Sequence, residues 1–568
     1  MILRRLYLYI VSAASLAVLA FGLGMLGTTA LLFAFNDPFA QQSRSSLATA
    51  TAMVLVAGLV WAIHFWFARH YAMRDASERA SALRHLYLYA ACFGGAVGAA
   101  IALNIAAGDA LRPLIDNCSV SGGPPTPAAY CRANANWEST SQAAWVGLVL
   151  LAVWAFHFWV AARDRAAVGE MGTSATLRRW YMYGAVLIGL LMLLSGLQQT
   201  IEVGWQKYVG SSRGDFRFAG ETIGLALGGF LLWGVHARTI ARHHLAEDRH
   251  STLRALQGFI AVAVSMVASL VALSTILYYA LARALGVESP GGVNPNDLSG
   301  ALATPTSQLI VYGIAWVLVM RRLTRDAGTQ EADRQAAIRR LYTNLASLVA
   351  LAAWAAGAAV LLGTLAEQLE AQVIGARASD WKDPSSLAAT LMVVGLAVWL
   401  AYWRQAPWAA DRQSLSRRLY VWAALLGSVL AALGGGVALL TVVLLEAFSV
   451  QPRLNDPANL QFASALAVIV VAAGVGIYHW RVLRGDAAAR PPRTAPTVEA
   501  PAPTSRAAVA EPVPTAAPVV AGAPSPDAHA HQYMLVVSDA TEDDIHQALA
   551  TLPPHASYKL TSNGHDGQ

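Results

Sequence analysis

The chain has 568 residues, of which 56% are hydrophobic and only 13% are charged. Soluble domains carry about 25% charged residues, so this composition excludes a large soluble protein and favours an integral membrane protein. The net charge of +6 is divided among many short basic segments. Because these segments form no single basic patch, we expect no binding to nucleic acid.

Long apolar stretches recur along the chain. Crossing the hydrocarbon of a bilayer takes about 20 apolar residues in a helix. The first stretch follows Arg4 and Arg5 as in a signal peptide, but it is longer than the roughly 7 to 15 residues of a signal-peptide core, so we treat it as a span. The stretches predict twelve transmembrane helices, at about 9–33, 48–68, 86–107, 142–162, 181–201, 220–240, 257–281, 301–320, 342–366, 386–404, 420–446 and 461–483.

A basic and aromatic heptamer precedes every second stretch. "LRRLYLY" at residues 3–9 returns as "LRHLYLY", "LRRWYMY", "LRALQGF", "IRRLYTN" and "SRRLYVW". The spacing leaves room for two spans, so each unit is a helical hairpin, and an even number of spans makes all hairpins parallel repeats. The predicted fold is thus all-α, with six two-helix repeats, here called hairpins 1 to 6, at about 1–80, 81–174, 175–250, 251–335, 336–414 and 415–485.

The heptamers predict interfacial anchors at the start of each first helix. Arginine can extend to the lipid headgroups while tyrosine lies in the interfacial aromatic belt. A second interpretation is that the arginine pairs bind anionic headgroups specifically. The residues concerned are Arg4, Arg5, Tyr7, Arg84, Tyr87, Arg178, Arg179, Tyr181, Arg339, Arg340, Tyr342, Arg417, Arg418 and Tyr420.

The distribution of basic residues predicts the topology. Most of the 40 lysines and arginines lie at the N-terminus, between hairpins and after the last span, and few lie in the loops inside hairpins. By the positive-inside rule, both termini and the connectors between hairpins are expected to be cytoplasmic. The expected location is a bacterial inner membrane.

Histidines recur near the end of second helices, in "WAIHFW" (His64), "WAFHFW" (His157), "WGVHAR" (His236) and "IYHWR" (His479). Such histidines could ligate haem or another metal, which would make the chain an electron-transfer protein. A histidine beside tryptophan at a membrane interface also needs no ligand. We favour this second interpretation and predict no metal and no cofactor.

Polar residues near the external helix ends form a second group of candidates. Glu202, Glu221, Gln198 and Gln199 could line an external vestibule, or they could be solvated helix ends. Acidic and basic residues are missing from the middle of the predicted spans. This argues against transport coupled to protons or sodium, which places ionisable groups near the midplane.

The longest external loop contains Cys118 and Cys131. We predict a disulfide between them because the loop lies on the side where disulfides persist. At the other end of the chain, residues 486–530 read as a disordered linker rich in alanine and proline. Residues 531–568 read as a small β-α-β-like element. Because so few residues rarely hold a core alone, it is either an element that docks on a cytosolic protein partner, which we favour, or a small marginal module.

The repeated two-helix units opened by an Arg-Arg-Leu-Tyr type of sequence resemble a bacterial integral-membrane family catalogued as a domain of unknown function, DUF5671. The resemblance covers about residues 1 to 485 and departs at Ala255 and Gln257, where other units have arginine or histidine and tyrosine. It implies a multi-pass membrane protein and no catalytic residues. Soluble-enzyme motifs are missing as well. We expect a non-enzymatic scaffold, sensor or assembly component, with a permease for a neutral or apolar solute as the alternative.

Overall fold

The computed structural model describes residues 2–37, 40–115, 133–170, 172–210, 219–249, 251–327, 333–374, 380–403, 414–447 and 461–488. The chain divides into two units, Met1–Pro492 and Arg493–Gln568, and all described residues belong to the first. Cys118, Cys131, most of the predicted linker and the C-terminal element lie outside the described residues. The disulfide and the docking element therefore stay predictions.

Within these described ranges, twelve helices are long and apolar enough to cross a membrane, which confirms the predicted polytopic all-α fold. They pair as α1 (Ile2–Ala34) with α2 (Arg44–Arg74), α4 (Ala82–Ile115) with α5 (Ala133–Val168), α6 (Thr173–Tyr208) with α7 (Ala219–His243), α9 (Thr252–Ala284) with α11 (Ala303–Ala327), α12 (Asp333–Ile374) with α13 (Lys382–Trp403), and α15 (Leu415–Ala447) with α16 (Gln461–Ala488).

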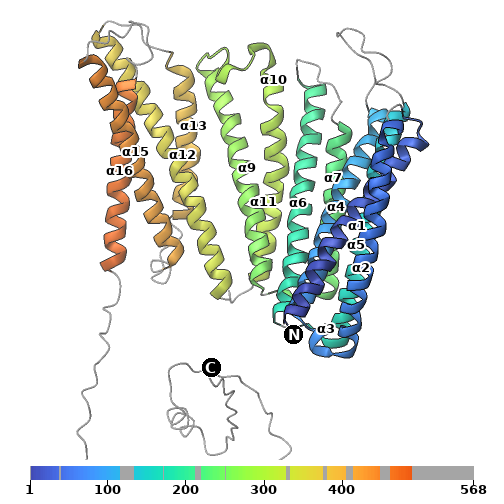
Figure 1. Cartoon of the computed structure of the whole chain (residues 1–568). Coiled ribbons are helices and arrows are strands. Elements are labelled where there is room, and N and C mark those ends of the chain that lie inside the picture. The colour runs from blue at the N-terminus through green and yellow to red at the C-terminus, as the bar shows by residue number, and fades with distance from the viewer. Residues whose placement is uncertain are drawn as a thin grey trace, which may run out of the picture. The chain divides into compact units, whose positions relative to one another are not determined.

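Short helices lie between the long ones. These are η1 (Ala40–Ser43), α3 (Ala76–Arg79), α8 (Leu245–Asp248), η4 (Pro290–Gly292), η5 (Pro295–Asp297) and α10 (Leu298–Ala301). The connector helix α3 lies at the lower end of the bundle in Figure 1, and α10, which lies inside a hairpin, at the upper end. Connectors and hairpin loops thus occupy opposite ends of the helices at these places, as the topology prediction requires.

The first helices begin earlier than the predicted spans. The predicted spans open within the heptamers, whereas in the structure each whole heptamer belongs to the first turns of its helix; α1, for example, begins at Ile2 and α4 at Ala82. Leucine and arginine are good helix formers, and the polar side chains of the heptamers find partners inside the protein, so the helix does not need to stop at the hydrocarbon boundary. The heptamer is therefore part of the helical core.

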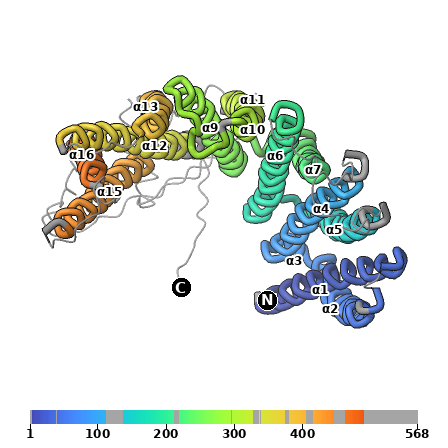
Figure 2. Tube along the Cα trace, turned by 90° about the horizontal axis from the view of Figure 1, so that it is seen from above, coloured from blue at the N-terminus to red at the C-terminus, as the bar shows by residue number. Residues whose placement is uncertain are grey.

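The hairpins pack in chain order with one recurring contact. The first helix of each hairpin packs against the second helix of the next hairpin, in the pairs α1/α5, α4/α7, α6/α11, α9/α13 and α12/α16. Figure 2 shows the helix pairs following one another from α1/α2 to α15/α16. Each hairpin therefore contacts its predecessor and its successor in the sequence.

One close helix contact lies between hairpins 2 and 3. Glycines four residues apart let helix backbones approach each other. A Cβ atom on Gly224 would lie 2.3 Å from the carbonyl oxygen of Asn104, and one on Gly228 would lie 2.5 Å from that of Ala100, so only glycine fits there. Gly94 and Gly98 of α4 are also four residues apart, but a Cβ atom on Gly94 would have no neighbour within 4 Å. The four-residue glycine spacing thus marks a close helix contact at both glycines of α7, but not at Gly94 of α4.

Candidate functional site

In four hairpins the heptamer tyrosine is hydrogen-bonded to the histidine of the second helix in the same hairpin. The distances from Tyr Oη to His Nε2 are 3.1 Å for Tyr7–His64, 2.9 Å for Tyr87–His157, 2.7 Å for Tyr181–His236 and 3.0 Å for Tyr420–His479. In hairpin 5, Tyr342 instead lies 3.2 Å from the hydroxyl of Tyr402, which stands at the place of the histidine. Two groups of residues that the sequence analysis treated separately therefore meet.

The geometry defines how these histidines are protonated. In each, Nδ1 lies 2.7–2.8 Å from the carbonyl oxygen four residues earlier in the helix. A carbonyl can only accept, so Nδ1 carries the proton, Nε2 is the acceptor, and the tyrosine hydroxyl donates to it. Because both ring nitrogens are used in this way, binding of haem iron or another metal would have to displace one of these bonds.

A tryptophan from the preceding hairpin completes the arrangement. The indole nitrogens of Trp61, Trp154 and Trp399 donate to the hydroxyls of Tyr87, Tyr181 and Tyr420 at 3.0, 2.8 and 2.9 Å. Each of these tryptophans stands three residues before the histidine, or Tyr402, of its own hairpin. We call this the Trp–Tyr–His relay: it joins the second helix of one hairpin to both helices of the next.

The relay is buried in the later hairpins. Tyr181 is 3% exposed and its partner His236 is also buried, whereas Tyr7 of hairpin 1 is 59% exposed. Hairpin 4 has Gln257 at the tyrosine position, and its side-chain amide has no hydrogen-bond partner within the described part of the chain. The relay is therefore interrupted at hairpin 4.

A second layer pairs heptamer arginines with carboxylates that lie in the last turns of the second helix of the same hairpin or just after it. Arg5 binds Glu78 at 2.8 Å, and Arg4 contacts the same carboxylate. The corresponding distances are 2.6 Å for Arg84–Asp164, 3.1 Å for Arg178–Asp248, 2.7 Å for Arg179–Asp248, 2.8 Å for Arg254–Asp326 and 2.7 Å for Arg417–Asp486.

This layer differs from the interfacial anchoring expected for the heptamers. Arg178 is only 1% exposed and contacts Glu170 as well as Asp248, and Tyr87, Tyr181, Tyr342 and Tyr420 are also buried. Among the other expected anchors, Arg339 and Arg418 are exposed and Arg340 is half-buried. A guanidinium can be buried only with a carboxylate partner, so the inward direction of Arg84 and Arg178 depends on these aspartates.

The carboxylates were missed from the sequence, although a signal exists. Asp164, Asp326 and Asp486 each stand seven residues after His157, Val319 and His479, which occupy the equivalent position in their hairpins. Seven residues are close to two helical turns, so each aspartate lies on the same face as the relay residue, nearer the helix end. The two layers of the site are therefore set by one helical face.

The connector after hairpin 3 contains the most buried ionisable groups outside the spans. Burial alone would raise the pKa of Asp248, but hydrogen bonds and charges from Arg179 and Arg178 outweigh it and hold the pKa below its ordinary value. Burial, together with the charges of Arg178 and Arg165, lowers the pKa of His244 to about 4. At neutral pH the connector thus contains an ionised aspartate and a neutral histidine.

The four vestibule candidates lie around the loop end of hairpin 3, where α6 ends and α7 begins. Thr304 of α11 donates to Glu202 at 2.6 Å, and Gln198 donates to Glu202 at 2.7 Å. Gln199 donates to Ser195 within α6 at 2.8 Å. Glu221 is exposed in the first turn of α7, where Gly108 of α4 approaches its backbone. Glu202 therefore bonds toward hairpin 4, and Glu221 begins a helix that packs on hairpin 2.

No group of three or more His, Cys, Asp or Glu side chains within the described ranges is placed to hold a metal ion. Cys92, the cysteine of the described part, is buried in α4.

The helices and the repeated pairs define a multi-pass membrane protein built on hairpins. The chain belongs to the family described as "Domain of unknown function (DUF5671)", whose model matches residues 5–121, 221–305 and 340–474. The second match includes the opening of α9, so the departures at Ala255 and Gln257 lie inside a matched segment. Comparison with curated proteins and with solved structures finds no match.

Proposed function

We propose that this protein is a non-enzymatic scaffold or assembly component of the membrane, with both termini on the cytoplasmic side of a bacterial inner membrane. The observation that carries the proposal is that the polar groups of the candidate site bond to one another. Indole, hydroxyl, imidazole, guanidinium and carboxylate groups are used in the relay and the arginine–carboxylate layer. Networks of paired polar groups rigidify a fold, and the predicted tail offers a way to recruit a cytosolic partner.

The scaffold proposal is tested by transport and by assembly. In proteoliposomes, the full chain is expected to pass glycerol, glucose and other uncharged solutes no faster than protein-free liposomes do. In mild detergent extracts of cells, the chain is expected in a species well above its own mass of 60.1 kDa, and removal of residues 531–568 should reduce that species. A variant with the same residues in shuffled order is the control. Solute flux together with a purely monomeric chain would contradict the proposal.

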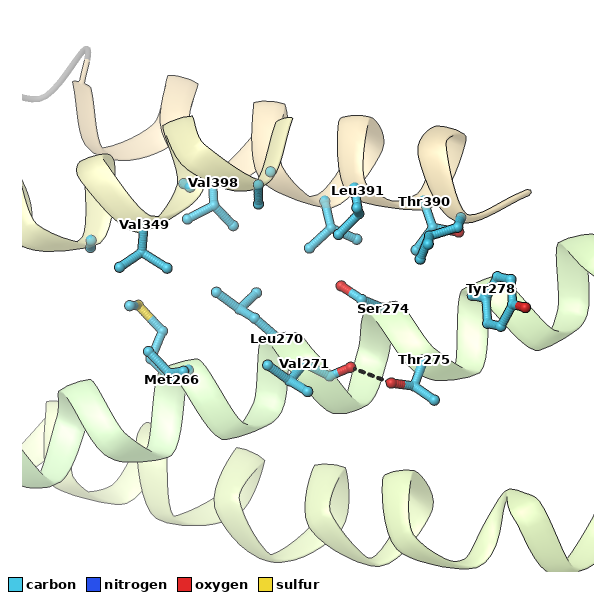
Figure 3. A pocket seen from close by; sticks show the side chains of 17 residues that line it. Met266, Leu270, Val271, Ser274, Thr275, Tyr278, Val349, Thr390, Leu391 and Val398 are labelled. Atoms are coloured by element: carbon cyan, nitrogen blue, oxygen red, sulfur yellow. Dashed lines mark hydrogen bonds between the residues drawn. The ribbon is translucent and has the colours of Figure 1, made fainter. Parts of the chain in front are cut away.

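A permease for a neutral apolar solute is the second candidate, because a groove lies between hairpins 4 and 5. It has a volume of about 270 Å³ and is lined by α9, α12 and α13. Figure 3 shows Leu270, Val271 and Ser274 of α9 facing Leu391 and Val398 of α13 across it. The lining contains no charged side chain, so a solute in this groove would be neutral.

Variants of the hydroxyl groups that line the groove can distinguish a permease from a scaffold. Thr275 Oγ1 donates to the carbonyl of Val271 at 2.9 Å, whereas buried Thr390 Oγ1 has no partner in the described part of the chain. With 2-decanone as the probe, Thr390→Val should weaken binding to the purified protein about two- to tenfold, the contribution of one neutral hydrogen bond. Thr275→Val changes the same atoms in the same groove and should leave binding unchanged. Equal effects, or no binding to the wild type, would remove the permease candidate.

A further inference from the structure

A polar pocket of about 310 Å³ lies where hairpins 1 and 2 meet. Its wall is formed by the C-terminal turns of α2 and α5, by α3 and by the first turn of α4, at the end of the bundle where α3 lies in Figure 1. The charged side chains that line it are Arg69, Arg79, Arg84, Arg163 and Asp164. It is thus enclosed by helix ends and lies at the margin of three spans, those of α2, α4 and α5.

The pocket has a large excess of positive charge. Its single carboxylate, Asp164, is bound by buried Arg84 at 2.6 Å. Arg79 lies 3.6 Å from the same carboxylate, and its buried Nε has no hydrogen-bond partner within the described residues. Four guanidinium groups therefore face one carboxylate, which leaves the donor of Arg79 available for an anion.

Two of these arginines are positioned by an aromatic ring instead of a carboxylate. The guanidinium carbons of Arg163 and Arg69 lie 4.6 and 5.6 Å from the ring centroid of Trp159, and neither arginine has an ion pair among the described residues. Trp159 is half exposed on the outside of α5, as tryptophans are at the level of lipid headgroups. The ring orders both cations at that depth without neutralising them.

We propose that this pocket binds the phosphate of one anionic phospholipid. Arginine forks match phosphate oxygens in geometry and charge, and they bind most strongly where water is partly excluded. A lipid fits the location, because the pocket adjoins the apolar surface of α2 and α5, on which acyl chains can lie. Arg79, Arg69 and Arg163 contact the phosphate, and Arg84 together with Asp164 forms the floor. The site is distinct from the paired network of the relay.

The test is a titration of the purified full-length protein with phosphatidylglycerol, monitored by native mass spectrometry. The wild type should retain one phosphatidylglycerol in preference to phosphatidylcholine. Arg69→Gln combined with Arg163→Gln removes two unpaired cations and should weaken this binding by about tenfold or more, as expected for charged hydrogen bonds to phosphate. A variant with Arg238→Gln and Arg242→Gln is the matched control. These two exposed arginines lie in the C-terminal turns of the second helix α7, as Arg69 and Arg163 lie in those of α2 and α5, but they are outside the pocket.

The control variant should bind phosphatidylglycerol within twofold of the wild type. Both double variants should keep the wild-type unfolding temperature, since none of the four arginines has an ion pair in the described part of the chain. A third arm offers inorganic phosphate: displacement of the lipid by micromolar phosphate would show that the pocket takes the free anion and would overturn the lipid assignment. Equal weakening in both variants, or equal retention of both lipids, would overturn the pocket itself.

Discussion

Asp248→Asn is expected to destabilise the folded protein by about 3 kcal/mol or more, the cost of removing one partner from a buried ion pair. Asp248 is 0% exposed and binds Arg178 at 3.1 Å and Arg179 at 2.7 Å. The substitution keeps the shape but removes the buried carboxylate, so that Arg178 keeps Glu170 at 2.7 Å and the exposed Glu247 at 3.6 Å. The measurement is the unfolding transition of the purified protein in detergent micelles.

Asp326→Asn is the matched control for this prediction. Asp326 forms the equivalent pair with Arg254 in hairpin 4, but its side chain is partly exposed to solvent. Pairs screened by water contribute about 1 kcal/mol or less. A loss for Asp326→Asn as large as that for Asp248→Asn would show that burial does not decide the strength of these pairs.

The same connector should make the protein sensitive to acid. The pKa of Asp248 is lower in the folded protein than in the unfolded chain. Its contribution to the free energy of unfolding is therefore complete above its unfolded-state pKa and is lost as the pH falls through its folded-state pKa. His244, whose folded pKa is about 4, must stay neutral in the folded state, so its contribution is lost as the pH falls below about 6.5, the ordinary histidine value. The wild type should lose stability below pH 6.5. A His244→Gln variant should lose less stability than the wild type between about pH 6.5 and the folded-state pKa of His244, about 4.

Tyr181→Phe is expected to cost about 2 to 4 kcal/mol, because it leaves two buried polar groups without partners at about 1 to 3 kcal/mol each. The hydroxyl of Tyr181 accepts from Trp154 at 2.8 Å and donates to His236 at 2.7 Å. Removing it breaks a bond between hairpins 2 and 3 and a bond inside hairpin 3. The unfolding transition in micelles measures the loss.

Tyr7→Phe removes the same hydroxyl from the equivalent tyrosine of hairpin 1. Tyr7 is 59% exposed, so water can satisfy the freed His64, and the expected loss is below about 0.5 kcal/mol. A double variant with Trp154→Phe and Tyr181→Phe should recover part of the stability lost in Tyr181→Phe. In the double variant the indole NH is gone, so only His236 is left buried without a partner. Equal losses for Tyr7→Phe and Tyr181→Phe would mean that the relay does not stabilise the hairpin contact.

The sequence was sufficient for the spans and the class of fold, since apolar length decides both. It also identified Tyr181 and His236 as members of repeated motifs, but not that they touch. Tyr and His of one hairpin are separated by 57, 70, 55 or 59 residues, and loops of different length hide the constant pairing. The role of Arg178 was misjudged for a related reason: an arginine at a helix start can extend to lipid or turn inward, and only the location of Asp248 decides between them.

The tryptophan of each relay comes from the earlier hairpin, which gives the array a direction from the N-terminus to the C-terminus. Tyr7 of hairpin 1 has no indole donor among the described residues, and hairpin 6 has Gly476 at the position that a tryptophan occupies in the other hairpins. During synthesis, each indole is already in the membrane when the next heptamer arrives, so a hairpin can dock on its predecessor without waiting for the rest of the chain. Gly476 ends this series, and a seventh repeat added by gene duplication would enter the bilayer with no indole to receive its tyrosine.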